Sequence, residues 1–233
     1  MSHLLRTAAL GSLLSAFTTL ALIFLPELFA PAPDFVRRMA RVRDPAYQLR
    51  AWIYLVHPLL VFAGAFGVAA LLRPRPLASP GLIGFGLWAA AEVAQQCLTL
   101  FAFDRWRRAW LAGDEAVRAT MEVRTAIYDG LWDAAYVLLL IGFLIGNACF
   151  GAAMARMRGL GRVVGLFFLA AAALTVSLLL PEFGGPALLE PVAAWPYPAI
   201  QPPGRLLIGL WLWREADRRK AGAPGDPHYM AAP

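Results

Sequence analysis

The chain has 233 residues, of which 60% are hydrophobic and only 15% are charged. A soluble domain carries roughly 25% charged residues, so this composition excludes an ordinary soluble domain and indicates an integral membrane protein. The net charge of +6 comes almost entirely from arginine. Beside apolar spans such charge sets membrane topology and contacts anionic lipids, so we expect membrane lipids, and no nucleic acid, as partners.

The apolar runs predict an all-α integral membrane protein, a bundle of about six transmembrane helices, with five crossings as the alternative. The expected spans cover about 7–29, 51–72, 81–103, 128–153, 163–180 and 203–220. The first run is too long for the apolar part of a signal peptide, so we expect it to remain in the protein. Residues 1–220 then form a single transmembrane helical domain, and 221–233 form a disordered C-terminal tail.

Between the spans, two segments have the pattern of interfacial amphipathic helices. Asp34 suits a helix N-cap, and Phe35, Met39 and Val42 after it share one face of a short helix. Residues 104–127 are charged and helical in pattern, so they predict an extramembrane helix that continues a neighbouring span.

Residues 181–203 contain seven prolines and cannot form one regular helix. Because this segment is also fairly apolar, we expect a proline-rich loop before the last helix, lying over or dipping into the mouth of the membrane domain. Pro203 suits the start of that last helix.

The positive charges divide almost equally between the two predicted sides, so their count does not set the orientation. The linkers on the side of the termini are short, basic and free of acids, whereas the opposite side has the long loops and most of the acids. We therefore predict a multi-pass protein of a bacterial-type inner (plasma) membrane, with both termini in the cytoplasm.

The third span carries a polar face near its middle. Five residues recur there at spacings of i, i+4, i+7, i+8 and i+11, which places them on one side of a helix: Trp88, Glu92, Gln95, Gln96 and Thr99. An ionisable residue at the centre of a membrane helix costs about 2.5–3.5 kcal/mol to insert. Such a residue faces a partner, a cavity or a ligand, and a purely structural role as buried hydrogen-bonding glue is the alternative for Glu92.

Other spans contribute polar residues to the same leaflet: His57 lies in the first turns of the second span, and Asp133 and Tyr136 lie in the first turns of the fourth. We therefore predict a polar pocket that opens on the side of the long loops and is capped by the proline-rich loop. Its predicted ligand-binding residues are Trp88, Glu92, Gln95, Gln96, Thr99, His57, Asp133 and Tyr136. Asp129, nearer the surface, is expected only to cap its helix or to pair with Arg124.

Two further patterns concern packing. Gly142 and Gly146 form a small-xxx-small pair, which is typical of closely packed membrane helices. Cys97 and Cys149 lie on different spans at different depths, so we expect two small buried residues and no disulfide.

Several classes of chemistry lack their motifs in this sequence. There is no HExxH motif, no cysteine pair with zinc spacing, no GxSxG turn and no P-loop. Of the three histidines only His57 lies in a span, which excludes a bis-histidine haem within the bundle. We therefore predict no metal and no other cofactor, and we assign no catalytic residue.

Three functions fit this pattern. The first is binding or transport of a small molecule, ion or proton at the Glu92 pocket, since buried acids and proline-broken segments mark transport sites. The second is an accessory or assembly subunit of a larger membrane complex, in which a partner helix satisfies the polar face. The third, which the missing motifs disfavour, is a membrane-embedded enzyme on a lipid-like substrate, with Glu92 and Asp133 as acid and base. A homodimer and a larger membrane complex both stay open as the assembled state.

Overall fold

The computed structural model describes residues 1–24, 32, 34–186 and 196–221, and it is all-α, with no strand in these ranges. The α-helices are α1 (Ser2–Phe24), α2 (Phe35–Ala40), α3 (Pro45–Leu72), α4 (Ala78–Cys97), α5 (Asp104–Ala112), α6 (Glu115–Met154), α7 (Gly159–Glu182) and α9 (Pro196–Lys220). Two short elements join them, the 3₁₀ turn η2 (Arg41–Arg43) and the π-helical turn η3 (Leu98–Phe103).

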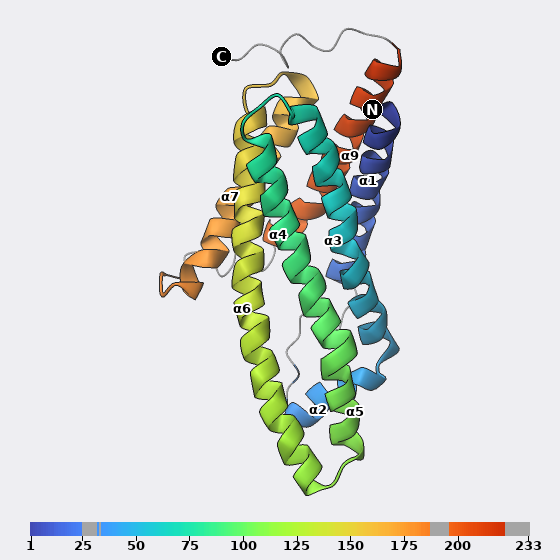
Figure 1. The fold of residues 1–233 in the computed structure, drawn as a ribbon, viewed down its shortest axis with the longest axis vertical. Helices are drawn as coiled ribbons and strands as arrows, with labels where there is room; N and C mark the ends of the chain where they lie inside the picture. Colours follow the sequence, from blue (N-terminus) through green and yellow to red (C-terminus); the bar gives the residue numbers. More distant parts are fainter. Residues whose placement is uncertain (25–31, 33, 187–195, 222–233) are drawn as a thin grey trace.

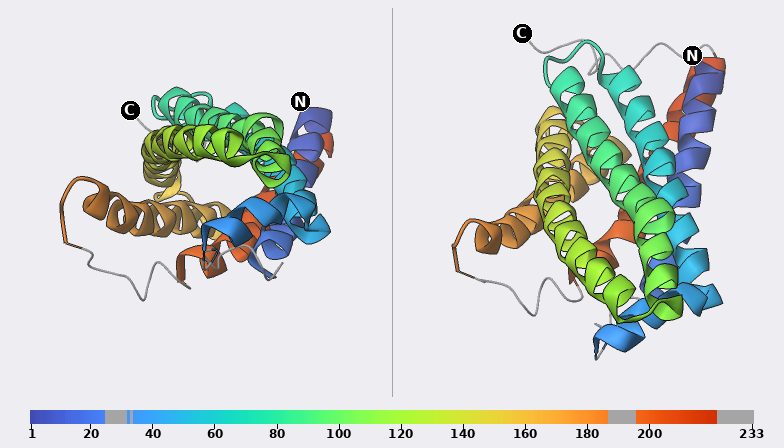
Figure 2. Two further views of the ribbon diagram at one scale, coloured as in Figure 1. Left: turned by 90° about the horizontal axis from the view of Figure 1, so that it is seen from below. Right: turned by 60° about the horizontal axis from the view of Figure 1, so that its bottom comes forward.

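The six long helices form a closed ring. Each of α1, α3, α4, α6 and α7 packs against the next long helix in the chain, and α9 packs back against α1 (Figures 1 and 2). An ion pair of 2.7 Å between Arg6 and Asp217 joins the start of α1 to the end of α9. Both ends of the helical domain therefore lie at the same end of the bundle, while α2 and α5 lie at the other end (Figure 1).

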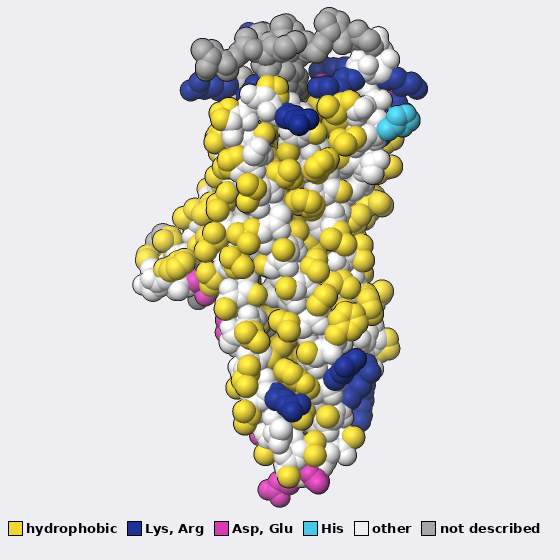
Figure 3. Space-filling model, in the orientation of Figure 1, with side chains coloured by type: hydrophobic (Ala, Val, Ile, Leu, Met, Phe, Trp, Pro, Cys, Tyr) yellow, Lys and Arg dark blue, Asp and Glu magenta, His cyan; other side chains and the backbone are white. Residues whose placement is uncertain are grey.

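Four of these helices, α1, α3, α6 and α7, are long and apolar enough to cross a membrane. Figure 3 shows the matching surface, on which hydrophobic side chains cover the middle of the molecule while Lys and Arg gather toward its two ends. These features indicate a membrane protein. At about 1.5 Å per residue the 40-residue α6 is roughly 60 Å long, so it extends well beyond the ~30 Å hydrocarbon core.

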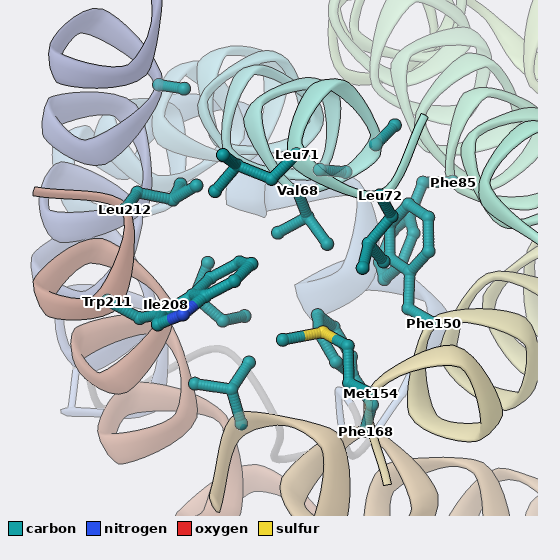
Figure 4. Close-up of a cluster of buried hydrophobic side chains, with 14 of the residues drawn as sticks. Val68, Leu71, Leu72, Phe85, Phe150, Met154, Phe168, Ile208, Trp211 and Leu212 are labelled. Atoms are coloured by element: carbon teal, nitrogen blue, oxygen red, sulfur yellow. The ribbon is translucent and has the colours of Figure 1, made fainter. Parts of the chain in front are cut away.

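Large apolar side chains fill the end of the ring that holds the termini. Figure 4 shows them pointing toward one another from α3, α4, α6, α7 and α9, and they include Val68, Leu72, Phe85, Phe150, Met154, Phe168, Trp211 and Leu212. Each of these side chains is almost completely buried. This end of the ring is therefore closed by a packed core.

Glycines bring the backbones of α4 and α6 into contact beside this core. A Cβ atom added to Gly84 would lie 2.4 Å from the Gly146 nitrogen and 2.8 Å from the Gly142 carbonyl oxygen. No side chain fits in that space, so the predicted close packing at Gly142 and Gly146 is confirmed. Cys97 and Cys149 are free and half-buried.

A helical hairpin forms the other end of the molecule, where we expected a single helix over 104–127. The chain instead turns at Gly113, and the Asp114 carboxylate caps α6 by accepting a bond of 3.0 Å from the Val117 amide. The turn lets both arms bury apolar side chains against α2 in a second, smaller core of Met39, Phe103, Trp110, Met121 and Tyr128. The predicted N-cap at Asp34 is confirmed, since its side chain accepts from the Arg37 amide at 2.7 Å.

The last helix begins earlier than predicted, at Pro196 and not at Pro203. Pro202 and Pro203 lie inside α9, where each removes one backbone donor. Such a loss is tolerated where neighbouring groups satisfy the freed carbonyls. The middle of the predicted proline-rich loop, 187–195, and the predicted disordered tail from 222 on lie outside the described residues.

The glycine contact gives a test of the helix packing. Gly142→Ala places a Cβ 2.6 Å from the Trp88 nitrogen, and such overpacking costs about 1–3 kcal/mol of unfolding free energy. Gly130→Ala, on the same helix, meets nothing within 4 Å, and loss of a mid-helix glycine stabilises by about 0.5–1 kcal/mol. Denaturant unfolding in detergent micelles measures both changes. Equal effects of the two substitutions would contradict the close α4–α6 packing.

Candidate functional site

Between the closed core and the hairpin, the ring surrounds a cavity of about 660 Å³. At its outer end Arg38 and Asp129 remain partly exposed, with 31% and 42% of their side chains accessible, so the cavity reaches the surface there. Seven of the eight predicted pocket residues line it: Trp88, Glu92, Gln95, Gln96, Thr99, His57 and Tyr136. Polar residues from several spans are thus brought together in one half of the bundle.

Asp133 is the exception. Its side chain is exposed and does not line the cavity, whereas Asp129, expected to have only a local role, does line it. The reason is helical phase, since Asp129, Trp132 and Tyr136 define the inward face of α6 and Asp133 is turned away from it. The structure therefore does not bring Glu92 and Asp133 together as an acid–base pair.

The polar face of α4 divides into two kinds of residue. Gln95 donates to the Trp132 carbonyl at 3.0 Å, and the Thr99 hydroxyl lies 2.8 Å from the Tyr128 hydroxyl. These two side chains, Gln95 of α4 and Thr99 of the π-helical turn η3, join this segment to α6, which is the structural role of polar groups in membrane helices. Glu92 and Gln96 differ from Gln95 and Thr99, because neither forms a hydrogen bond or an ion pair with any residue that the structure describes. Both are nevertheless buried, with 7% of Glu92 and 6% of Gln96 exposed.

His57 joins three helices at one wall of the cavity. Its Nδ1 atom lies 2.8 Å from the Thr18 hydroxyl of α1, and its ring packs edge-on against Trp88 of α4 at 6.2 Å between centroids. The hydrogen bond uses one ring nitrogen and the Trp88 contact fixes the ring. His57 thus has a clear packing role at the edge of the site.

Two further residues line the cavity that are not among the predicted ligand-binding residues, Gln201 and Arg205 of α9. The Arg205 guanidinium donates to the Gln201 amide oxygen at 3.4 Å, and its carbonyl accepts from the Ser12 hydroxyl at 2.8 Å. The Gln201 amide nitrogen is buried and has no hydrogen-bond partner among the described residues. The charge of Arg205 also acts on both Glu92 and His57 across the cavity.

Four more arginines line the outer part of the cavity and also escaped prediction: Arg38, Arg41, Arg50 and Arg107. In the sequence these four residues have the pattern of arginines that set membrane topology. A pattern that could have revealed one of them is present, since Tyr47, Arg50, Tyr54 and His57 recur at i, i+3, i+7 and i+10 on one face of α3.

An ion pair between Arg38 and Asp129 holds α2 against α6 at the mouth of the cavity. The guanidinium donates to both carboxylate oxygens, which is the bidentate geometry that arginine favours. Hydrogen bonding to Asp129 raises the pKa of the Arg38 guanidinium above its usual value, so Arg38 remains charged at the mouth.

A second ion pair, between Arg107 and Asp104, is buried and stabilises the elements that form the mouth of the cavity. Arg107 donates to Asp104 at 2.9 Å and to the Tyr47 hydroxyl at 2.5 Å, and Gln48 donates to the other Asp104 oxygen at 2.7 Å. The exposed fractions of the Arg107 and Asp104 side chains are only 4% and 2%. This network fixes the start of α3 to α5, just beyond the π-helical turn that ends α4.

The buried pair can be compared with an exposed one. Asp104→Ala leaves the Arg107 charge buried without its carboxylate partner, and breaking such a pair costs about 3–5 kcal/mol. Asp217→Ala removes the partner of Arg6 in a pair whose side chains are 33% and 51% exposed, for which we expect at most about 1 kcal/mol. Unfolding free energies in micelles measure both, and equal costs would contradict the buried network.

The residues that line the cavity limit the kinds of ligand that it can bind. Within the described ranges, no three His, Cys, Asp or Glu side chains gather as a metal site. Considering only contacts among the described residues, the cavity instead combines the carboxyl group of Glu92 and the amides of Gln96 and Gln201, which have polar atoms without hydrogen bonds, with several guanidinium groups within apolar walls such as Leu139, Leu140 and Phe143. A few polar groups that converge within a mostly apolar concavity are typical of a small-molecule site.

Comparison of this chain with protein-family models, with curated proteins and with solved structures finds no match in any of the three.

Proposed function

We propose that this membrane protein binds a small molecule in the cavity around Glu92 and handles it within the bilayer, as a transport or carrier protein does. The cavity volume of about 660 Å³ suits such a ligand, because small-molecule sites occupy roughly 300–1,000 Å³. Glu92, Gln96 and Gln201 contact the ligand, while Gln95, Thr99 and His57 fix the walls.

The unbonded state of Glu92 is the observation that carries this proposal. Placing an ionisable group at a membrane helix centre costs about 2.5–3.5 kcal/mol, and a carboxyl group retained as structural glue would return that cost through hydrogen bonds. Glu92 forms none with the described residues, yet its neighbours Gln95 and Thr99 do. An ionisable group that destabilises the fold and faces a cavity is characteristic of a functional site.

The finer topology belongs to the same proposal. The 20 residues of α4 reach roughly 30 Å, the thickness of the hydrocarbon core, and α4 and α9 complete the ring with the four apolar helices. Six crossings result, with α2 and α5 lying in the interfacial region. The contact of Arg6 with Asp217 supports an even number of crossings. We place both termini in the cytoplasm and the protein in a bacterial-type inner membrane.

Stability distinguishes a functional Glu92 from a structural one. Glu92→Gln removes a buried acid that has no bonded partner among the described residues, so we expect the unfolding free energy in micelles to rise by about 1 kcal/mol. Glu115→Gln changes an exposed acid at the start of α6 and should change it by less than about 0.5 kcal/mol. A loss of 1 kcal/mol or more in Glu92→Gln would identify Glu92 as structural glue.

The same two variants test binding. Native mass spectrometry of protein extracted gently from its membrane should show a bound small molecule in the wild type and in Glu115→Gln. Its occupancy should fall about tenfold in Glu92→Gln, because a hydrogen bond to a charged group contributes about 1.5–3 kcal/mol. Copurification of a stoichiometric protein partner in place of a small molecule would instead support the accessory-subunit function.

A further inference from the structure

The inner part of the cavity carries polar groups that no described residue satisfies. Glu92 and Gln96, one turn apart on α4, form no hydrogen bond with the described residues, and the Gln201 amide nitrogen of α9 has no acceptor among them. All three side chains are 8% exposed or less, and burial of a polar group without hydrogen bonds is unfavourable. The three groups therefore favour a ligand that supplies the missing hydrogen bonds.

Arg205 connects these groups, although they lie on different helices. Its guanidinium donates to the Gln201 amide oxygen at 3.4 Å, and its charge acts on Glu92. The Glu92 carboxylate and the Arg205 guanidinium thus place one charge of each sign in this part of the cavity. A cationic head would lie near the like charge of Arg205, and an anionic head near that of Glu92, so the pair favours a ligand with an uncharged head.

The polar atoms of the site also define the hydrogen bonds that such a head must form. The amide nitrogen of Gln201 only donates, so it needs an acceptor on the ligand. The carboxylate of Glu92 only accepts, so it needs a donor on the ligand. A hydroxyl group meets both needs, because it has one hydrogen to donate and two lone pairs that accept, whereas an ammonium group has no acceptor.

Apolar side chains line the cavity beside this polar site. The ring centre of Phe143 lies 5.8 Å from the Arg205 guanidinium carbon, and Leu139 of α6 and Leu178 of α7 continue the apolar wall. The last turns of α7 lean away from α6 (Figures 1 and 2), and both leucines are only half-buried. An apolar chain that covers them buries further apolar surface, which favours binding.

We propose, on the basis of the small-molecule function above, that the ligand of this cavity is an uncharged amphiphile with a hydroxyl head and an apolar chain. The hydroxyl group donates to Glu92 and accepts from Gln96 and Gln201. The chain follows Leu139 and Leu178 between α6 and α7. A molecule of this class dissolves in the bilayer, which suits a carrier that handles its ligand within the membrane.

Photolabelling in lipid nanodiscs tests this proposal with three probes that share one chain: dodecanol, dodecylammonium and dodecanoate, each with a diazirine at the end of the chain. Illumination attaches a bound probe to the residues beside its diazirine, and mass spectrometry of the peptides locates the label. At equal concentrations in the bilayer, dodecanol should label the segments around Leu139 and Leu178 about tenfold more than either charged probe, because only its head satisfies the polar site without a like charge.

Three substitutions test the head site. Gln201→Leu and Gln96→Leu each remove one donor to the hydroxyl group and should lower labelling by dodecanol about tenfold. Gln96→Leu breaks no hydrogen bond between described residues, so it preserves the test if Gln201→Leu fails to fold. Asp133→Leu is the matched control, because Asp133 follows Trp132, which bonds to Gln95 at this depth, but is exposed and lies outside the cavity lining.

Three results would overturn the proposal: a charged probe labelling these segments as strongly as dodecanol, Asp133→Leu lowering the labelling as much as Gln96→Leu, or label confined to exposed outer residues such as Ile83 and Leu166. If a charged probe labels the cavity best and Glu92→Gln abolishes this labelling, the uncharged head is wrong while the small-molecule function remains. If no probe labels the cavity and no small molecule copurifies with the wild type, both fail.

Discussion

The fold depends on close approach of helix backbones at glycines in one half of the ring. Gly84 meets α6 there, Gly11 and Gly64 lie at the contact of α1 with α3, and Gly165 meets the end of α6. In a bilayer, packing at small residues replaces the hydrophobic driving force that holds soluble bundles together. The cavity half of α6 lacks such contacts, since Gly130 touches nothing within 4 Å and α6 meets the other arm through the stacked rings of Tyr128 and Phe103. The ring is therefore closed at one end and hollow at the other.

The hollow end collects the polar groups, because a side chain that can hydrogen-bond is costly to place against lipid. Some of these groups are used by the fold: Gln95, Thr99 and His57 each bond to a neighbouring helix. Others remain open, and among the described residues Glu92 and the Gln201 amide nitrogen are the clearest cases. The helical hairpin adds a buried ion pair that fixes the arginine-rich mouth without filling it. In this half of the ring, the stabilising contacts thus lie in the walls and at the mouth of the cavity, and the polar groups that face its interior are left available.

Much of this arrangement could be predicted from the sequence where helical spacing alone decides it. The polar face around Glu92 and the glycine pair at Gly142 lie where the 3.6-residue period places them. Asp133 was misplaced because two acids four residues apart differ in direction by only about 40°, so the sequence could not say which one faces inward. Arg205 lies in the first turn of the predicted last helix, near the surface, whereas α9 starts seven residues earlier and buries Arg205 within the bundle. The arginines of the mouth were missed because the same residue type also marks membrane topology.

The central claim is that Glu92 and Gln96 face a water-accessible cavity and not lipid. Labelling of single cysteines tests it most directly, in protein whose Cys97 and Cys149 are replaced by serine and which is embedded in lipid nanodiscs. Gln96→Cys lies on the cavity side of α4, and Ala94→Cys, about 3 Å away in depth, lies on its exposed outer side. A charged thiol reagent needs water to form and reach the thiolate, so it should label Gln96→Cys and leave Ala94→Cys unmodified. Labelling of Ala94→Cys alone, or of neither, would contradict the account.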